Sequence, residues 1–185
     1  MVDLHEGVRL LDDAAVGFAS SRDLLIATGP DAATYLQGQL SQDVEGLPVG
    51  ATSRTLLLQP QGKVDSWLRV HRSAPEVFWL DTDAGHGDAA AARLNRFKLR
   101  VDLTIEVSTV PVLSVRGARA AHVIEGLSGG VVALDAAWGG LAGFDLLHPA
   151  GDLDPEALAA TLGLPMGPPE LAEVSRVLQG QPAMG

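Results

Sequence analysis

The sequence contains no cysteine among its 185 residues. This absence excludes disulfide bonds, thiol nucleophiles and any zinc or iron–sulfur centre held by thiolates of this chain. Aromatic residues make up only 4% of the sequence, and no apolar run reaches the ~20 residues that a membrane helix needs. The acidic amino terminus lacks the basic and apolar regions of a secretory signal. We therefore expect a cytoplasmic protein without a membrane partner.

Positive charge is also scarce, because 13 Lys and Arg residues stand against 23 Asp and Glu residues, a net charge of −10. This balance argues against extensive binding to nucleic acid or anionic lipid, although a local basic patch is compatible with it. The sequence has neither a G-x-x-x-x-G-K-[ST] phosphate loop nor an H-E-x-x-H zinc motif. The five histidines show no ligand spacing, so no metal site is predicted.

What the sequence does contain is a hydrophobic pattern of alternating strands and helices. The pattern predicts a helix over residues 30–44, which Pro30 suits as a first helical position. Strands are expected over residues 23–28, 76–81, 98–107, 111–115, 131–135 and 143–147, and helices over 85–97, 118–127, 154–162 and 168–178. Asp154 is expected to be the N-cap of the 154–162 helix, with Pro155 in its first turn. The second half echoes the first, which predicts a duplicated β/α unit with mostly antiparallel strands, an α+β fold.

A predicted hairpin over residues 55–70 is the first candidate for chemistry. Its turn, Gln59-Pro-Gln-Gly62, has proline and glycine where a tight turn favours them. Strand alternation then places Asp65 on the same face as Lys63 and Trp67. The carboxylate can accept a hydrogen bond from a ligand N–H or act as a general base, and the indole offers a flat apolar surface. An exposed strand face with a Lys–Asp pair is the simpler alternative.

A second candidate is Arg93-Leu-Asn-Arg-Phe-Lys-Leu-Arg100, which contains four cations within eight residues. The simpler interpretation is a solvated helix end whose cations favour the negative end of the helix dipole. The alternative is a docking patch for a polyanion, such as the glutamate tail of a ligand or RNA phosphate.

Several segments together resemble a known family. They are Asp31-Ala-Ala-Thr-Tyr-Leu-Gln-Gly-Gln-Leu-Ser-Gln-Asp-Val44, Leu57-Leu-Gln-Pro-Gln-Gly-Lys-Val-Asp65, Arg96-Phe-Lys-Leu-Arg100, Gly143-Phe-Asp-Leu-Leu147 and Arg176-Val-Leu-Gln-Gly-Gln-Pro-Ala-Met-Gly185. In this order they resemble the folate-binding YgfZ group, part of the superfamily of the glycine-cleavage T-protein, an aminomethyltransferase (GcvT). The resemblance implies duplicated β/α subdomains, residues 1–110 and 111–185 of one folded body, around a central tetrahydrofolate cavity.

The resemblance also implies a folate site on the hairpin. Asp65 matches the first aspartate of the T-protein pattern G-G-[IL]-x-D-D, while Ser66 replaces the second aspartate. Lys63 stands where the T-protein has an aliphatic residue. These two departures favour the YgfZ side of the superfamily and argue against aminomethyl transfer. Asp65, Lys63 and Trp67 are therefore expected to contact tetrahydrofolate or a one-carbon derivative of it.

Four further positions are expected to contribute to the folate site by resemblance alone. Tyr35 and Leu36 match the helix that lines the pteridine side. Asp145 is the nearest match to a ligand-holding glutamate of the T-protein, and Arg176 lies at the arginine-bearing helix of the family. No residue is assigned a catalytic role, and no catalytic activity of the chain's own is expected.

YgfZ-type proteins act in iron–sulfur cluster upkeep and tRNA modification, and this role requires the cysteine of a K-G-C-[YF]-x-G-Q-E motif. The sequence ends at Gly185, before that motif would begin, and we expect it to lack the carboxyl-terminal barrel as well. We therefore expect a folate-binding body that works with an iron–sulfur or tRNA-modification partner. Whether the chain is truncated, split or natural, and whether it forms a homodimer, stays open.

Two other functions compete with this interpretation. The first is a T-protein-like aminomethyltransferase of the glycine cleavage system, which uses the same scaffold. The second is an interaction module that has lost its ligand and docks RNA or a protein through residues 93–100. Which folate form binds, if any, is likewise left open by the sequence.

Overall fold

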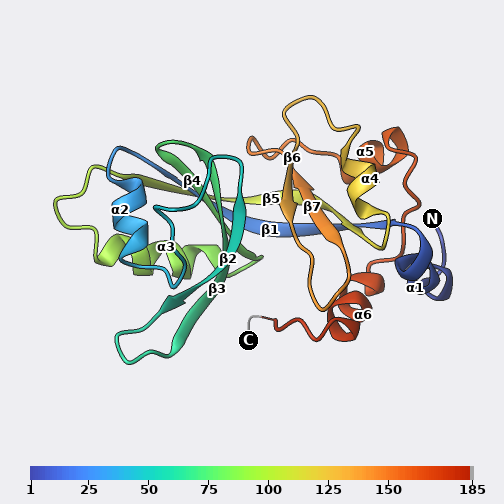
Figure 1. The fold of residues 1–185 in the computed structure, drawn as a ribbon, viewed down its shortest axis with the longest axis horizontal. Helices are drawn as coiled ribbons and strands as arrows, with labels where there is room; N and C mark the ends of the chain where they lie inside the picture. The colour runs from blue at the N-terminus through green and yellow to red at the C-terminus, as the bar shows by residue number, and fades with distance from the viewer. Residues whose placement is uncertain (184–185) are drawn as a thin grey trace. The chain divides into compact units, whose positions relative to one another are not determined.

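The computed structural model describes residues 1–183 (Figure 1). Its helices are α1 (Leu4–Asp13), α2 (Ala32–Gln37), α3 (Gly87–Arg96), α4 (Ala120–Ile124), α5 (Pro155–Thr161) and α6 (Glu170–Leu178). Its strands are β1 (Val16–Thr28), β2 (Thr52–Leu58), β3 (Val64–Ala74), β4 (Val77–Asp83), β5 (Thr104–Arg116), β6 (Val132–Asp135) and β7 (Gly143–Leu147). Met184 and Gly185, which end the last segment of the family resemblance, lie outside the described residues.

The chain forms two compact units, and two long strands contribute residues to both. The middle unit comprises residues 22–109, and the terminal unit comprises residues 1–21 together with 110–183. Strand β1 crosses the first boundary in the sequence and β5 crosses the second. One unit boundary lies between residues 109 and 110, and residues 1–21 pack with the second half of the chain. The expected subdomains 1–110 and 111–185 stay a prediction. The internal duplication and the central cavity stay predictions.

The middle unit is an antiparallel sheet with two helices on one face (Figure 1). Its strands follow the order β2-β3-β4-β1, and every ladder between these neighbours is antiparallel. Leu36 of α2, Leu94 of α3 and Leu68 of β3 are fully buried in one hydrophobic cluster. Because strand side chains alternate between faces, the same alternation that buries Leu68 leaves Trp67 and Arg69 on the opposite face.

The terminal unit has its own sheet and core. Its strands β5, β7 and β6 are adjacent and antiparallel, and their cluster includes Leu113 and Leu146 with Ala159 of α5. The predicted N-cap Asp154 is confirmed, since its carboxylate accepts from the backbone N–H groups of Glu156 and Ala157 at 3.0 Å. Helix α1, which the hydrophobic pattern did not reveal, packs its Leu11 with other buried residues of this unit.

The expected helix over residues 30–44 is wrong beyond its first half. Helix α2 ends at Gln37, and Leu40 instead forms an isolated bridge with Leu57 of β2. The Gln37 side chain then holds the following loop, because its carbonyl oxygen accepts from the N–H of Val44 at 2.6 Å. The apolar spacing that suggests a long helix therefore reflects burial of loop residues against the sheet.

The two strands expected over residues 98–107 and 111–115 are also wrong in their bounds. A loop leads to a single strand, β5, which begins only at Thr104 and continues through Pro111. The Asp31 carboxylate holds this loop by accepting from the N–H of Asp102 at 2.8 Å. A side chain at Gly29 would lie only 2.3 Å from the Asp102 carbonyl oxygen, so this close approach requires glycine.

A buried carboxylate fixes the start of α3. Asp23 of β1 accepts hydrogen bonds from the N–H groups of Gly85 and Gly87, each at 2.8 Å, and from the Thr109 hydroxyl at 2.7 Å. A Cβ at Gly87 would lie 2.6 Å from the Asp23 Cβ, so helix and strand pack without room for a side chain. Burial raises the pKa of Asp23, but these hydrogen bonds outweigh it and the pKa lies below its ordinary value.

Replacing this carboxylate with an amide is expected to destabilise the middle unit in a pH-dependent way. Asp23→Asn should lower the free energy of unfolding by about 1.5–3 kcal/mol at pH 7, because charged acceptors form the stronger hydrogen bonds. Because the pKa of Asp23 is lower in the folded state, its ionised carboxylate stabilises the protein fully above the unfolded-state pKa of about 3.9. This stabilisation is lost as the pH falls through the folded-state pKa. Urea unfolding between pH 7 and pH 3 should therefore show the difference from wild type shrinking with acidification.

The matched control is Asp88→Asn, because Asp88 lies exposed in the first turn of the same helix. This change should alter stability by less than about 1 kcal/mol, the range of an exposed helix-dipole interaction. Equal losses in the two variants, or a loss in Asp23→Asn that does not depend on pH, would contradict the assignment.

Candidate functional site

The predicted hairpin between β2 and β3 is confirmed. The Gln59 N–H donates to the Lys63 carbonyl and the Gly62 N–H donates to the Gln59 carbonyl, both at 2.8 Å. Gly62 adopts a φ of +79°, a left-handed conformation that glycine accepts without a steric cost. The Gln59-Pro-Gln-Gly62 signal is therefore local turn chemistry, which explains why the sequence alone was sufficient to find it.

Asp65 sits at a β-bulge directly after this turn. The register passes from Leu57 opposite Ser66 to Leu58 opposite Val64, which leaves Asp65 without a residue across from it. Such an extra residue interrupts the alternation of a strand and redirects its side chain. The predicted common face of Lys63, Asp65 and Trp67 is thus broken at Asp65.

The redirected carboxylate of Asp65 lies near the side chain of Arg93 on α3. Its Oδ2 atom is 3.5 Å from the Arg93 Nε atom, and its Oδ1 atom accepts from the Gln59 amide at 3.5 Å. Both contacts are long, and 30% of the side chain is exposed. A carboxylate has about four acceptor positions, so Asp65 retains capacity to accept a hydrogen bond from a ligand.

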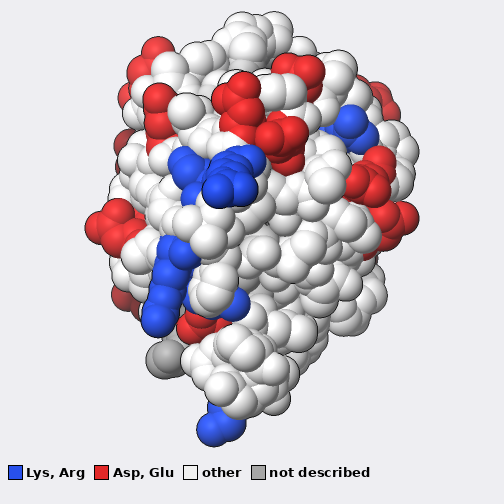
Figure 2. Space-filling model, turned by 90° about the vertical axis from the view of Figure 1, so that its left-hand side faces the viewer, with Lys and Arg blue, Asp and Glu red and all other residues white. Residues whose placement is uncertain are grey.

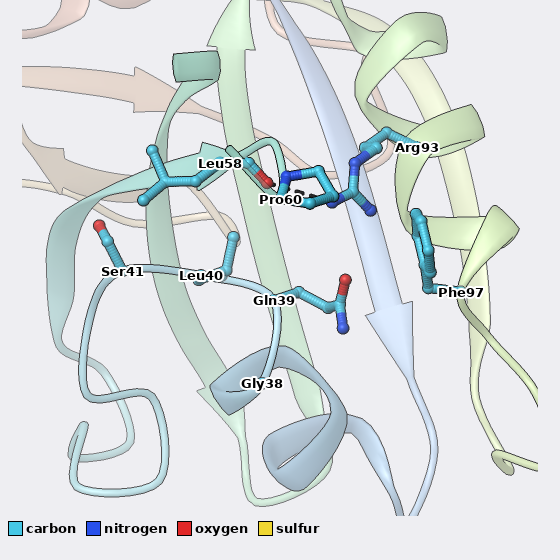
Figure 3. A pocket seen from close by; sticks show the side chains of 8 residues that line it. All are labelled: Gly38, Gln39, Leu40, Ser41, Leu58, Pro60, Arg93 and Phe97. Atoms are coloured by element: carbon cyan, nitrogen blue, oxygen red, sulfur yellow. Dashed lines mark hydrogen bonds between the residues drawn. The ribbon is translucent and has the colours of Figure 1, made fainter. Parts of the chain in front are cut away.

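Arg93 connects α3 to the hairpin. Its Nη2 atom donates to the Leu58 carbonyl at 3.1 Å, and its guanidinium lies 4.2 Å from the centre of the Phe97 ring. Its Nη1 atom is buried and has no hydrogen-bond acceptor among residues 1–183. Figure 3 shows this side chain at the edge of a pocket, with the Gln39 side chain facing it.

This pocket belongs entirely to the middle unit and has a volume of about 390 Å³. Three segments form its walls: the loop after α2, the start of the hairpin, and α3 with the residue that follows it. The lining residues are Gly38, Gln39, Leu40, Ser41, Leu58, Pro60, Arg93 and Phe97 (Figure 3). None of the residues predicted from the sequence to bind folate lines this pocket.

Tyr35 and Leu36 lie in the hydrophobic core of the middle unit. Leu36 is fully buried, and the Tyr35 hydroxyl donates to the backbone carbonyl of Leu94. Burial raises the pKa of Tyr35, while the charge of Arg93 opposes that rise. Both side chains therefore contribute to holding α2 against α3, and the pteridine contact expected of them stays a prediction.

Asp145 and Arg176 belong to the terminal unit, whereas the hairpin residues belong to the middle unit. The Asp145 carboxylate pairs with Arg116 at 2.9 Å and accepts from the Ser114 hydroxyl at 2.8 Å. Arg176 pairs with Glu173 one helical turn earlier and lowers the pKa of that carboxyl through a hydrogen bond. Both predicted ligand contacts stay predictions.

One buried charged cluster was missed in the sequence. The Asp81 carboxylate on β4 accepts from Arg22 of β1 at 2.7 Å and also from Arg69 of β3, and Asp83 pairs with Arg22 as well. These four residues cross three adjacent strands of the middle unit, on the face that also carries Trp67. The alternating acids Asp81 and Asp83 of β4 are visible in the sequence, but only the packing of the three strands shows that they belong to a charged cluster.

Three cations of residues 93–100, Arg93, Arg96 and Lys98, make separate contacts with other groups of the chain. The Lys98 ammonium donates to the Leu103 carbonyl at 2.8 Å, and the Arg96 guanidinium lies 5.8 Å from the Phe97 ring centre. On the face drawn in Figure 2, basic side chains form several separate groups, and acidic side chains lie beside some of them. Both interpretations of this segment, the solvated helix end and the polyanion docking patch, stay predictions.

Neither a metal cluster nor a membrane helix is found within the described part of the chain. No three His, Asp or Glu side chains among residues 1–183 are grouped closely enough to hold a metal ion. No helix in the same range is long and apolar enough to cross a bilayer.

Comparison with solved structures shows the fold. The glycine cleavage system aminomethyltransferase T from Bartonella henselae matches with a TM-score of 0.72 and 23% sequence identity. The match covers 86% of this chain and 48% of the Bartonella chain, and at this identity it shows similarity of fold alone.

Comparison with curated proteins finds an uncharacterized protein from Haemophilus influenzae, 42% identical over 57 residues. These residues are 31% of this chain and 20% of the Haemophilus protein, so only a small part of the relative is matched. The sequence model of the family described as the GCVT N-terminal domain matches residues 14–140, which is more than half of the chain. The chain belongs to the GCVT N-terminal domain family.

Proposed function

We propose that this chain is a folate-binding protein of the YgfZ type, which binds tetrahydrofolate or a one-carbon derivative at the β2–β3 hairpin. The observation that carries the proposal is the bulged Asp65, whose 30% exposed side chain retains acceptor capacity at the position that resembles the family's folate-contacting aspartate. Membership of the GcvT superfamily and the T-protein-like fold support the same ligand.

The hairpin residues suit the chemistry of a reduced folate. The pterin ring carries N–H donors that a carboxylate accepts well, and Asp65 offers such a carboxylate. Trp67 is half-buried and provides an indole face for an aromatic ring, while the exposed Lys63 ammonium suits the carboxylates of the glutamate tail. When bound, tetrahydrofolate supplies a carrier for one-carbon groups.

Each hairpin residue has a separate task in this proposal. Asp65 accepts from the pterin and orients it, and Arg93 of α3 pairs with the Asp65 carboxylate on its other side. Ser66 replaces the second acid of the T-protein pattern, so this position has no carboxylate. The Ser66 side chain is 4% exposed and lies opposite Leu57. With one acid at this position the chain binds a folate without transferring an aminomethyl group.

The cellular role follows the YgfZ resemblance. We place the chain in iron–sulfur cluster maintenance and tRNA modification, in the cytoplasm, together with a protein partner that provides the reactive cysteine. This division of labour is consistent with the absence of cysteine from the sequence, because thiolate chemistry then requires another segment or another protein.

Folate binding is expected to depend on the Asp65 carboxylate. Isothermal titration calorimetry with tetrahydrofolate under anaerobic conditions should give saturable heat with wild type and an at least tenfold higher Kd with Asp65→Ala. The reason is the loss of one charge-assisted hydrogen bond, which contributes about 1.5–3 kcal/mol. Gln61→Ala, an exposed change in the same turn, is the matched control and should bind as wild type does. No heat with wild type, or the same Kd with Asp65→Ala, would refute the proposal.

Aminomethyl transfer is expected to be absent. Incubation with tetrahydrofolate and an aminomethylated lipoyl carrier protein should produce no methylene-tetrahydrofolate above the rate without protein, because Ser66 replaces the second acid. Turnover that disappears in Asp65→Ala would instead identify an aminomethyltransferase.

A further inference from the structure

The pocket beside Arg93 is preformed by backbone and side-chain contacts. The Ser41 N–H donates to the Leu56 carbonyl at 3.0 Å, and the Leu56 N–H donates to the Ser41 hydroxyl oxygen at 2.9 Å. The bridge between Leu40 and Leu57 and the Gln37 contact to Val44 fix the same loop on either side. The polar groups of the pocket are therefore already in position before a ligand binds, which reduces the entropy cost of binding.

The guanidinium of Arg93 supplies the charge that this pocket presents. Its Nη2 and Nε atoms face Leu58 and Asp65, which leaves Nη1 as the buried nitrogen without an acceptor in residues 1–183. A guanidinium does not lose its proton in proteins, so this N–H group cannot be neutralised. The Arg93 side chain is 17% exposed and lines the pocket, so an incoming oxyanion can approach this charge.

The remaining lining residues complement an oxyanion that is attached to an apolar body. The Ser41 oxygen already accepts from Leu56, so its own hydroxyl hydrogen is available to donate. The Gln39 amide faces Arg93 across the pocket (Figure 3). Pro60 and Phe97 provide apolar walls, and a volume of about 390 Å³ lies in the range of small-molecule sites.

We propose that this pocket binds a small organic carboxylate or phosphate with an apolar or aromatic body. Arg93 and the Ser41 hydroxyl donate to the oxyanion, Gln39 adds a further polar contact, and Phe97 packs against the body. Asp65, Lys63 and Trp67 do not line this pocket, although Arg93 also pairs with Asp65. Its dimensions favour a small molecule over a nucleic-acid backbone.

Titration of the full 185-residue chain, followed by amide NMR, tests the proposal with two probes. Sodium benzoate represents an aromatic carboxylate, and inorganic phosphate represents the second oxyanion. Either probe should produce saturable shifts at the amides of residues 38–41 and of Phe97, and tighter binding of benzoate would assign the apolar walls a role. Absence of saturable shifts at these amides with both probes would overturn the proposal.

Two variants separate the pocket from the surrounding charge. Arg93→Lys keeps the charge but loses the forked donor geometry and should weaken binding of the probe that saturates by at least tenfold. Arg96→Gln removes a cation of the same helix that does not line the pocket, and its Kd should stay within twofold of wild type. Equal weakening in both variants would indicate only diffuse attraction and would contradict the site.

A third variant keeps the test decisive if Arg93→Lys does not fold, which amide dispersion would reveal. Gln39→Leu changes a loop side chain that has no core role and should weaken binding about fivefold. Lys63→Ala changes a proposed folate contact that does not line the pocket, so benzoate binding should be unchanged in this variant. Wild-type affinity in Gln39→Leu together with an unaffected or unfolded Arg93→Lys would refute the proposal.

Discussion

The arrangement around the hairpin depends on one half-buried cation, the guanidinium of Arg93. A guanidinium in this position remains charged and requires acceptors, so the elements around it must bring oxygen atoms to it. The chain meets this demand with the Leu58 carbonyl at the end of β2 and the Asp65 carboxylate at the bulge of β3. Helix α3 and the hairpin are thereby linked, and the direction of Asp65 follows from the same contact.

The other end of α3 is fixed by a charge of the opposite sign. Asp23 accepts from two N–H groups at the start of the helix, where the helix dipole favours an anion. The helix is thus held at its amino end by a carboxylate of β1 and near its carboxyl end by the contacts of Arg93. The cluster around Asp81 similarly connects β1, β3 and β4, and a buried carboxylate of this kind is tolerated because guanidinium donors satisfy its oxygens. Charged side chains therefore set the geometry of a unit whose core is otherwise mainly apolar.

The sequence predicted those elements whose signals are local. The hairpin turn, the N-cap Asp154 and strand β7 depend on a few adjacent residues, and the structure confirms them. The helix expected to extend to Val44 failed because apolar residues buried from a loop have the same spacing as those of a helix face. The bulge at Asp65 depends on the register between two strands, which no single segment encodes.

The candidate site was predictable only in part, for the same reason. Asp65, Lys63 and Trp67 follow from the hairpin pattern and the family resemblance. Arg93 is visible in the sequence only as part of the cation run 93–100, and its place beside Asp65 depends on the packing of α3 against the hairpin. The pocket needs three segments from residues 38–97 to meet, and the charged cluster needs three strands in register. Tyr35 and Leu36 were named from the motif alone, and the structure adds that both side chains pack in the hydrophobic core.

The central claim is that a reduced folate lies against the bulged segment of β3, and intermolecular NOEs test its location directly. In a complex with tetrahydrofolate, the account predicts NOEs from ligand protons to the Trp67 ring and to the Ser66 amide. A complex that forms with NOEs only to residues elsewhere in the chain would contradict the account, because binding would then not involve the hairpin.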